Sequence, residues 1–281
     1  MVQLVPSCGV GTLERHADFA SRFVDARHVD VWLPPEYCSV GPRRFPVLYM
    51  HDGQNLFRAE DAFMGVDWDV AGAVVRLVEG GIIEPVIVVG IWNTAKRRQE
   101  YMPQKPFEAR GGACELPGYE GLYGGPPLSD AYLGFLFEEL KPFIDRTYLT
   151  CPEREKTWMM GSSMGGLVSL YALCEAPHML GGVACLSTHW PVLEWAMVDY
   201  VRRHLPPPGQ HRLYFDYGTE TLDAFYAEHQ GRIDEVMRAA GYVEGRDWIT
   251  RCFEGAEHSE RAWRERVHIP LAFLLGDRSK A

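Results

Sequence analysis

One short segment, residues 157–167, limits what this chain can fold into more than any other. It reads TWMMGSSMGGL: an apolar run, a turn of small residues around Ser163, and an apolar helix start. Gly161 and Gly165 lie two positions to either side of Ser163, which is typical of a sharp strand-to-helix turn where a Cβ would obstruct the approach of strand and helix. The pattern predicts Ser163 as a nucleophile and the amide of Met164 as a donor to an oxyanion.

The rest of the chain alternates short apolar runs with longer amphipathic segments. Strands are expected at 28–33, 46–50, 85–91, 157–160, 182–186, 213–215 and 248–250, and helices at 67–78, 129–144, 167–173, 233–240 and 262–275. Strands that are apolar throughout are typical of a parallel sheet covered on both faces. We therefore expect one α/β domain over residues 1–281, with a mostly parallel sheet and helices on both faces. The Gly- and Pro-rich segment 102–127 is expected to be a lid or substrate-binding loop.

Charge and cysteine content restrict the partners and the compartment. The formal net charge of −10 makes nucleic acid and anionic membrane surfaces unfavourable partners. Seven cysteines without a CxxC pair fit a reducing compartment, and no secretory signal or transmembrane-length run is visible. We expect a cytoplasmic protein that acts on a small molecule. The sequence predicts no particular oligomeric state.

A serine nucleophile needs a base and an acid. In chains with such a turn the order is Ser, then Asp or Glu, then His. His258 follows the last expected strand and is the favoured base, with His189 as the alternative. The acid is expected after the strand at 213–215, where Asp223 is favoured over Glu220 and Asp216.

The segment after the strand at 46–50 is expected to supply a second oxyanion donor, the amide of Gln54. Asp52 and Asn55 in this segment are also conceivable metal ligands, but no HExxH, paired CxxC or calcium-loop spacing supports a metal. We expect neither metal nor cofactor.

Substrate contacts are harder to place. Trp92 and Trp190 lie in segments expected to border the site and are candidate substrate-binding residues. Tyr101, Tyr119 and Tyr123 lie in comparable loops, and each of these aromatic side chains is as compatible with packing as with substrate contact. Arg97 and Arg98 are equally compatible with binding an anionic group of the substrate and with a solvated position on the surface.

Taken together, these motifs resemble the putative-esterase family of the α/β-hydrolase fold, which includes esterase D-like, feruloyl and enterochelin-esterase-like enzymes. The resemblance rests on segments 29–37 (VDVWLPPEY), 47–55 (VLYMHDGQN), 90–103, 138–148, 161–167 (GSSMGGL) and 255–263 (GAEHSERAW), and covers nearly the whole chain. It implies Ser163 as nucleophile, His258 as base, and amides near Gln54 and Met164 as the oxyanion hole. The family often places its acid three residues after the glycine of the turn. In this chain that position is Thr221, which is not an acid, so both Glu220 and Asp223 remain candidates.

The resemblance implies a serine esterase that works through an acyl-enzyme. Two alternatives remain at this point. The same triad can transfer an acyl group to an alcohol other than water, and a chain of this fold can be a binding protein without catalysis.

Overall fold

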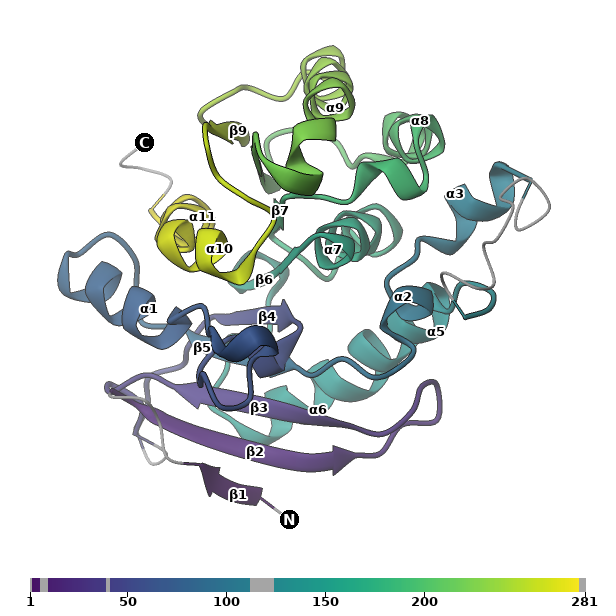
Figure 1. Cartoon of the computed structure of the whole chain (residues 1–281). Coiled ribbons are helices and arrows are strands. Elements are labelled where there is room, and N and C mark those ends of the chain that lie inside the picture. Colours follow the sequence, from purple (N-terminus) through teal and green to yellow (C-terminus); the bar gives the residue numbers. More distant parts are fainter. Residues whose placement is uncertain (1, 6–9, 39–40, 112–123, 278–281) are drawn as a thin grey trace.

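The computed structural model describes residues 2–5, 10–38, 41–111 and 124–277. A nine-stranded sheet runs through the centre of the molecule in the order β1-β2-β3-β5-β4-β6-β7-β8-β9 (Figure 1). Its strands are β1 (Val2–Val5), β2 (Thr12–Phe19), β3 (Arg27–Leu33), β4 (Val47–His51), β5 (Ile87–Ile91), β6 (Thr157–Ser162), β7 (Gly182–Leu186), β8 (Arg212–Gly218) and β9 (Trp248–Phe253).

The six strands from β5 to β9 in this order are parallel, and β1, β2 and β3 add to one side of them in antiparallel pairs. This confirms the expected α/β fold with a mostly parallel sheet. All residues of β4, β5, β6 and β7 are buried, which is why their sequences are apolar without alternation.

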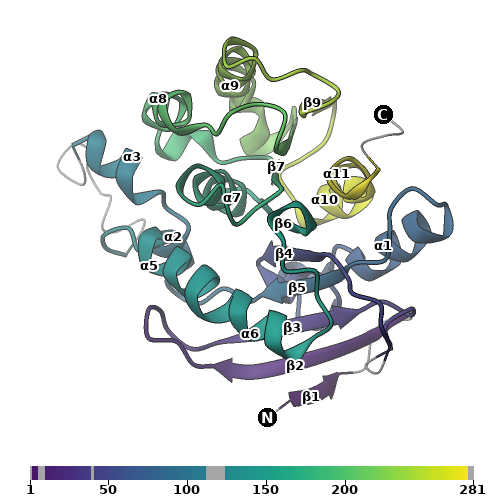
Figure 2. The same ribbon diagram turned by 180° about the vertical axis from the view of Figure 1, so that it is seen from behind.

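Helices cover both faces of the sheet (Figures 1 and 2). One face packs against α1 (Val70–Glu79), α10 (Glu260–Arg266) and α11 (His268–Leu275). The other packs against α5 (Ser129–Gly134), a π-helical turn (Phe135–Leu140), α6 (Lys141–Thr147), α7 (Met164–Glu175), α8 (Trp195–His204) and α9 (Ala227–Ala239). Of two short helices, α2 (Arg97–Glu100) lies beside α5, and α3 (Gln104–Ala109) lies towards α8 (Figures 1 and 2).

All the expected helices are present, with shifted ends. The segment expected at 262–275 is divided at Val267, just before Pro270, because proline is tolerated only in the first turn of a helix. Several elements of the described chain were not expected: the strands β1 and β2, of which β2 is only partly buried, the short helices α2 and α3, and α8. The expected lid at 102–127 contains α3, while residues 112–123, with Tyr119 and Tyr123, lie outside the described part of the chain.

Two further findings concern the chain as described. Five of the seven cysteines are within the described residues, and all five are free: Cys38, Cys151, Cys174, Cys185 and Cys252. Among the described residues, no helix has both the length and the apolar character needed to cross a membrane.

The parallel strands end at one edge of the sheet, and the segments that follow them meet there. Ser163 follows β6, the turn from Asp52 to Asn55 follows β4, and Asp223 and His258 follow β8 and β9. The carboxyl edge of a parallel sheet is where ligands bind in open α/β folds. This edge therefore holds the candidate site.

Candidate active site

Ser163 occupies the strained turn between β6 and α7. Its backbone has φ 56° and ψ −122°, a conformation that non-glycine residues rarely adopt. A Cβ at Gly161 would lie 2.8 Å from the backbone carbon of Gly165, so the glycine lets strand and helix approach. The Ser163 amide donates to the Leu186 carbonyl at 2.8 Å, and the Ser163 carbonyl accepts from the His189 amide at 3.2 Å. The end of β7 and the segment after it thus hold the turn in place.

His258 and Asp223 form a hydrogen-bonded pair in the segments that follow β9 and β8. His258 Nδ1 lies 2.6 Å from Asp223 Oδ1, and both side chains are largely buried. The His258 backbone is fixed as well, because its amide donates to Thr221 Oγ1 at 2.8 Å. The carboxylate requires Nδ1 to carry the proton, which leaves Nε2 as the free basic nitrogen.

The three acid candidates occupy different environments. Asp223 is 1% exposed and contacts His258, whereas Glu220 is exposed and makes no such contact. Asp216 is also buried, but it pairs with Arg266 at 3.1 Å and accepts from the Ser187 amide. His189, the alternative base, bonds through Nδ1 to the Tyr226 hydroxyl. The structure therefore brings Asp223 and His258 together, and not the alternatives.

Ser187 supports Asp223 from the side away from His258. The Ser187 hydroxyl oxygen accepts from Trp263 Nε1 at 3.0 Å and from Arg266 Nη2 at 2.9 Å. A hydroxyl oxygen has two lone pairs, so both are occupied and its own hydrogen points to Asp223 Oδ2, 2.5 Å away. The Gly218 amide donates to the same carboxylate oxygen at 2.6 Å.

These contacts keep Asp223 charged. Burial by itself raises the pKa of the Asp223 carboxyl, but the hydrogen bonds from His258, Ser187 and Gly218 outweigh it and hold the pKa below its ordinary value. Burial raises the pKa of Asp216 in spite of its pairing with Arg266. The carboxylate beside His258 is therefore the one best held in its ionised form.

The turns after β4 and β6 each bring one backbone amide to the site. Neither the Gln54 amide nor the Met164 amide has a hydrogen-bond acceptor among the described residues, as expected for the first residues of a 3₁₀ helix (Gly53–Asn55) and of α7. The Gln54 side-chain oxygen accepts from the Asn93 amide at 3.3 Å. Both free amides belong to residues that border Ser163 or its pocket.

Asp52 anchors this turn. Its carboxylate accepts two hydrogen bonds from Arg97, at 2.6 and 2.7 Å, and one from Asn93 Nδ2 at 2.6 Å. Burial raises the pKa of Asp52, but Arg97 and Asn93 outweigh it, so the pKa stays below its ordinary value. Both carboxylate oxygens are thus engaged by protein groups. Across the described residues, no cluster of three or more His, Cys, Asp or Glu side chains is arranged to hold a metal ion.

A pocket of about 680 Å³ opens in front of Ser163 and His258. No hydrogen bond joins the Ser163 hydroxyl to His258, which is common in sites without substrate. Many of the lining side chains are polar or charged, and the lining residues are Asp52, Gln54, Asn55, Phe63, Asn93, Ala95, Arg97, Arg98, Gly124, Ser162, Ser163, His258, Glu260 and Trp263. We call this hollow the catalytic pocket.

The two tryptophans expected to bind substrate do not line the catalytic pocket. Trp190 is 1% exposed and packs in the core against Phe215. The Trp92 indole donates to Asp30 at 2.9 Å and lies under the Arg15 guanidinium. Both side chains are held by packing on the sheet, so we do not retain them as substrate contacts.

Several residues of the site carried no signal in the sequence. Arg97 was weighed as a partner of an anionic substrate group or as a surface residue, whereas its side chain pairs with Asp52 inside the site. Ser187 and Arg266 lie in segments without a recognisable motif, and only their contacts with Asp223 and Asp216 mark them. An apolar stretch ending in Ser-Thr-His at 187–189 is the single local hint for Ser187.

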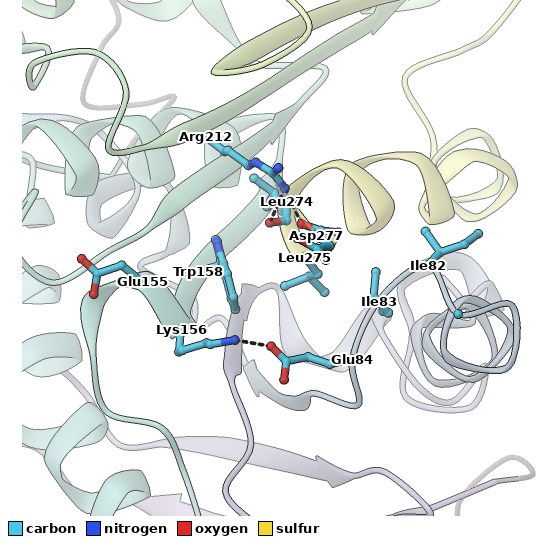
Figure 3. A pocket seen from close by; sticks show the side chains of 12 residues that line it. Ile82, Ile83, Glu84, Glu155, Lys156, Trp158, Arg212, Leu274, Leu275 and Asp277 are labelled. Carbon is cyan, nitrogen blue, oxygen red and sulfur yellow. Dashed lines mark hydrogen bonds and ion pairs between the residues drawn. The ribbon is translucent and has the colours of Figure 1, made fainter. Parts of the chain in front are cut away.

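A hollow of about 660 Å³ at the opposite edge of the sheet is less suited to chemistry (Figure 3). It lies where β6 and β8 begin, whereas Ser163 follows the end of β6. Arg212 donates there to the carbonyls of Phe273 and Gly276, and Lys156 pairs with Glu84. These polar groups link the elements of the fold to one another.

Sequence comparisons with known proteins give matches over most of the chain. The sequence model of the family described as "Putative esterase" matches residues 20–269. A Bacillus subtilis (strain 168) protein named "Uncharacterized protein YbbA" is 26% identical over 276 residues, which cover 95% of this chain and 97% of that protein.

Two solved structures share the fold. A ferulic acid esterase superposes with a TM-score of 0.69 at 18% identity, covering 95% of this chain and 99% of its own. An IroE-like serine hydrolase from Shewanella oneidensis superposes with a TM-score of 0.66 at 19% identity, covering 93% of this chain and 78% of its own. At such identities the likeness extends to the α/β fold alone.

Proposed function

This chain belongs to the putative-esterase family and is therefore an esterase, and from that premise we propose that it cleaves carboxylic esters through a Ser163–His258–Asp223 triad. The observation that carries the proposal is the pocket itself. The proposal is supported by a serine on a strained turn and a histidine that line the same pocket, and by the buried carboxylate that is hydrogen-bonded to Nδ1 of this histidine. This is the set of groups that makes a hydroxyl nucleophilic.

In the proposed reaction, His258 Nε2 takes the proton from Ser163 Oγ as that oxygen attacks the ester carbonyl. The carbonyl oxygen becomes an anion and is stabilised by the free amides of Gln54 and Met164, the latter at the N-terminus of α7. His258 then donates its proton to the departing alcohol. This leaves an acyl group on Ser163.

Water completes the cycle. His258 takes a proton from a water molecule as the water attacks the acyl carbonyl, and then returns the proton to Ser163 as the acid leaves. Asp223 holds the Nδ1–H tautomer and stabilises the imidazolium that forms twice per cycle. The proposal needs no metal and no cofactor.

Hydrolysis of p-nitrophenyl acetate by the wild type, Ser163→Ala and His258→Ala tests the proposal. We expect both variants to lose about 10³-fold or more in kcat. A serine-directed phosphonate is expected to label the wild type at Ser163, as located by peptide mass spectrometry. Equal activity of wild type and Ser163→Ala, or a label on another residue, would exclude this nucleophile.

The fate of the acyl group is a separate question. Adding a competing alcohol during turnover distinguishes hydrolysis from acyl transfer. Release of the free acid at an unchanged rate supports hydrolysis. Formation of a new ester in preference to the acid would make the protein an acyltransferase with the same triad.

A further inference from the structure

An apolar groove of about 550 Å³ lies beside the catalytic pair. It is formed by the segment after β7 and by the short helix Thr221–Phe225, the same helix that carries Asp223. Three of its side chains are unusually exposed for their type: Trp195 at 42%, Leu222 at 48% and Phe225 at 70%. Its lining consists of His189, Pro191, Glu194, Trp195, Leu222, Phe225, Tyr226 and His229.

The wall of this groove is also the support of the catalytic residues. His189 and Tyr226 are joined by a hydrogen bond of 2.8 Å, and both line the groove. The amide of His189 donates to the carbonyl of Ser163, and the ring of Tyr226 meets the ring of His258 edge to face, with centroids 5.8 Å apart. A group bound in the groove therefore lies one side chain away from the reacting atoms.

The groove carries almost no charge at neutral pH. Burial lowers the pKa of His189 to about 4 and also lowers the pKa of His229, so both imidazoles are neutral. The remaining ionisable group, Glu194, is paired with Arg110 at 3.3 Å. The catalytic pocket, by contrast, is lined by charged residues of both signs, including Arg97 and Glu260.

The lining of the groove favours aromatic groups. The rings of Trp195 and His229 stack face to face, with their centroids 4.5 Å apart and their planes at 17°. Phe225 and Tyr226 supply two more rings. Aromatic rings prefer such neighbours, and a volume of this size is within the range of small-molecule sites.

We propose that this groove binds an uncharged aromatic group of the ester, while the polar remainder of the substrate lies in the catalytic pocket. The proposal rests on the esterase function of Ser163. It goes further by assigning the substrate class and the residues that select it. Trp195, Leu222 and Phe225 are then specificity-determining residues.

Three esters test the assignment: methyl 3-phenylpropanoate, benzyl acetate and methyl acetate. We expect Trp195→Ala and Phe225→Ala to lower kcat/KM by about tenfold or more for a ring-bearing ester and by less than about twofold for methyl acetate. Whichever ring-bearing ester is affected shows whether the ring belongs to the acid or to the alcohol. Val243→Ala, at a 45% exposed position outside the groove, is the matched control and should change none of the three.

A charged substituent on the ring of the substrate provides a second test. Methyl 3-(4-carboxyphenyl)propanoate is expected to be a poor substrate of the wild type and a better one for Leu222→Lys, because the new ammonium can pair with the ring carboxylate. Equal losses for all three neutral esters in the Trp195 and Phe225 variants would show that the groove only supports the fold. No loss for either ring-bearing ester would also overturn the proposal.

Binding without turnover separates this proposal from the esterase function. Calorimetric titration of the Ser163→Ala protein with N-methyl-3-phenylpropanamide is expected to give a Kd that rises by about tenfold in Ser163→Ala/Phe225→Ala. That result supports the groove even if Ser163 proves not to be the nucleophile. An unchanged Kd in the double variant, both for this amide and for N-benzylacetamide, which carries its ring on the side of the alcohol, would reject the groove, whatever the esterase assays show.

Discussion

The hydroxyl of Ser187 lies 2.5 Å from Asp223 Oδ2, on the carboxylate oxygen that His258 leaves free. Its hydrogen has no alternative direction, because Trp263 and Arg266 occupy both lone pairs of the hydroxyl oxygen. The acid of the proposed triad is thus oriented by a residue 36 positions earlier in the chain.

Asp223→Asn is expected to lower kcat by about 10⁴-fold, since the amide favours the wrong tautomer of His258. Glu220→Gln is the matched control and should remain within about twofold of the wild type, as its exposed side chain makes no contact with His258. Steady-state hydrolysis of p-nitrophenyl acetate measures both. A larger loss in Glu220→Gln than in Asp223→Asn would transfer the role to Glu220.

Ser187→Gly is expected to reduce kcat by about tenfold with little change in KM, because Asp223 loses one of its donors. Glycine is chosen because Ser187 has φ 41°, which alanine tolerates poorly. Trp263→Phe keeps the Ser187 hydroxyl but frees one of its lone pairs, and should have the smaller effect. A Ser187→Gly enzyme with wild-type kcat would contradict the orienting role.

Arg97→Met is expected to reduce the free energy of unfolding by about 3 kcal/mol, because the buried carboxylate of Asp52 is left without its cation. Since Asp52 begins the turn that carries Gln54, kcat should fall as well. Asp52→Asn/Arg97→Met should recover much of the stability. Urea unfolding monitored by tryptophan fluorescence measures the stabilities, and a double variant no more stable than Arg97→Met would argue against the pairing.

The buried His51 makes stability depend on pH. Burial lowers its pKa from 6.5 to about 4, so the unfolded chain binds the proton more readily between these values. The stabilising effect is complete above pH 6.5 and is lost as the pH falls, by about 2 kcal/mol between pH 7 and pH 5. His51→Gln should flatten the unfolding free energy over this interval by that amount. His178→Gln, at an exposed position, should follow the wild-type curve.

Two glycines are expected to respond to alanine in opposite directions. A Cβ at Gly218 would lie 2.0 Å from the Ala256 carbonyl oxygen, so Gly218→Ala should cost about 1–3 kcal/mol and displace the loop that carries His258. Gly231 in α9 has no neighbour within 4 Å of such a Cβ, and Gly231→Ala should gain about 0.5–1 kcal/mol. Thermal unfolding compares the two variants. A stable, fully active Gly218→Ala would show that the loop can move to accommodate the added methyl group.

The sequence predicted best those features that depend on residues close together in the chain. The apolar runs of β4, β5, β6 and β7 mark strands buried on both faces, and the glycines around Ser163 mark the turn. Chain order led to His258 and Asp223, which lie 2.6 Å apart in the fold. Their catalytic roles remain predictions.

Other features depend on contacts between distant segments. Arg266 reaches Asp216 across 50 positions, and Arg97 reaches Asp52 across 45, distances over which no sequence motif extends. Strand β2, which lies between β1 and β3, is largely polar and only partly buried, so its sequence lacks the clear pattern of the central strands. Trp190 was expected to contact substrate because its segment borders the site, but its side chain is buried in the core. Position in the sequence does not distinguish these two roles.

The order of the strands also has a consequence for a chain that is still being synthesised. β4 and β6 can pair early, and with them the turn at Asp52 and the turn at Ser163 take shape. The proposed base, His258, lies 95 positions after Ser163, and Arg266, which supports the proposed acid, lies 103 positions after it, so both leave the ribosome later than Ser163. A growing chain therefore contains its proposed nucleophile well before it contains the proposed base.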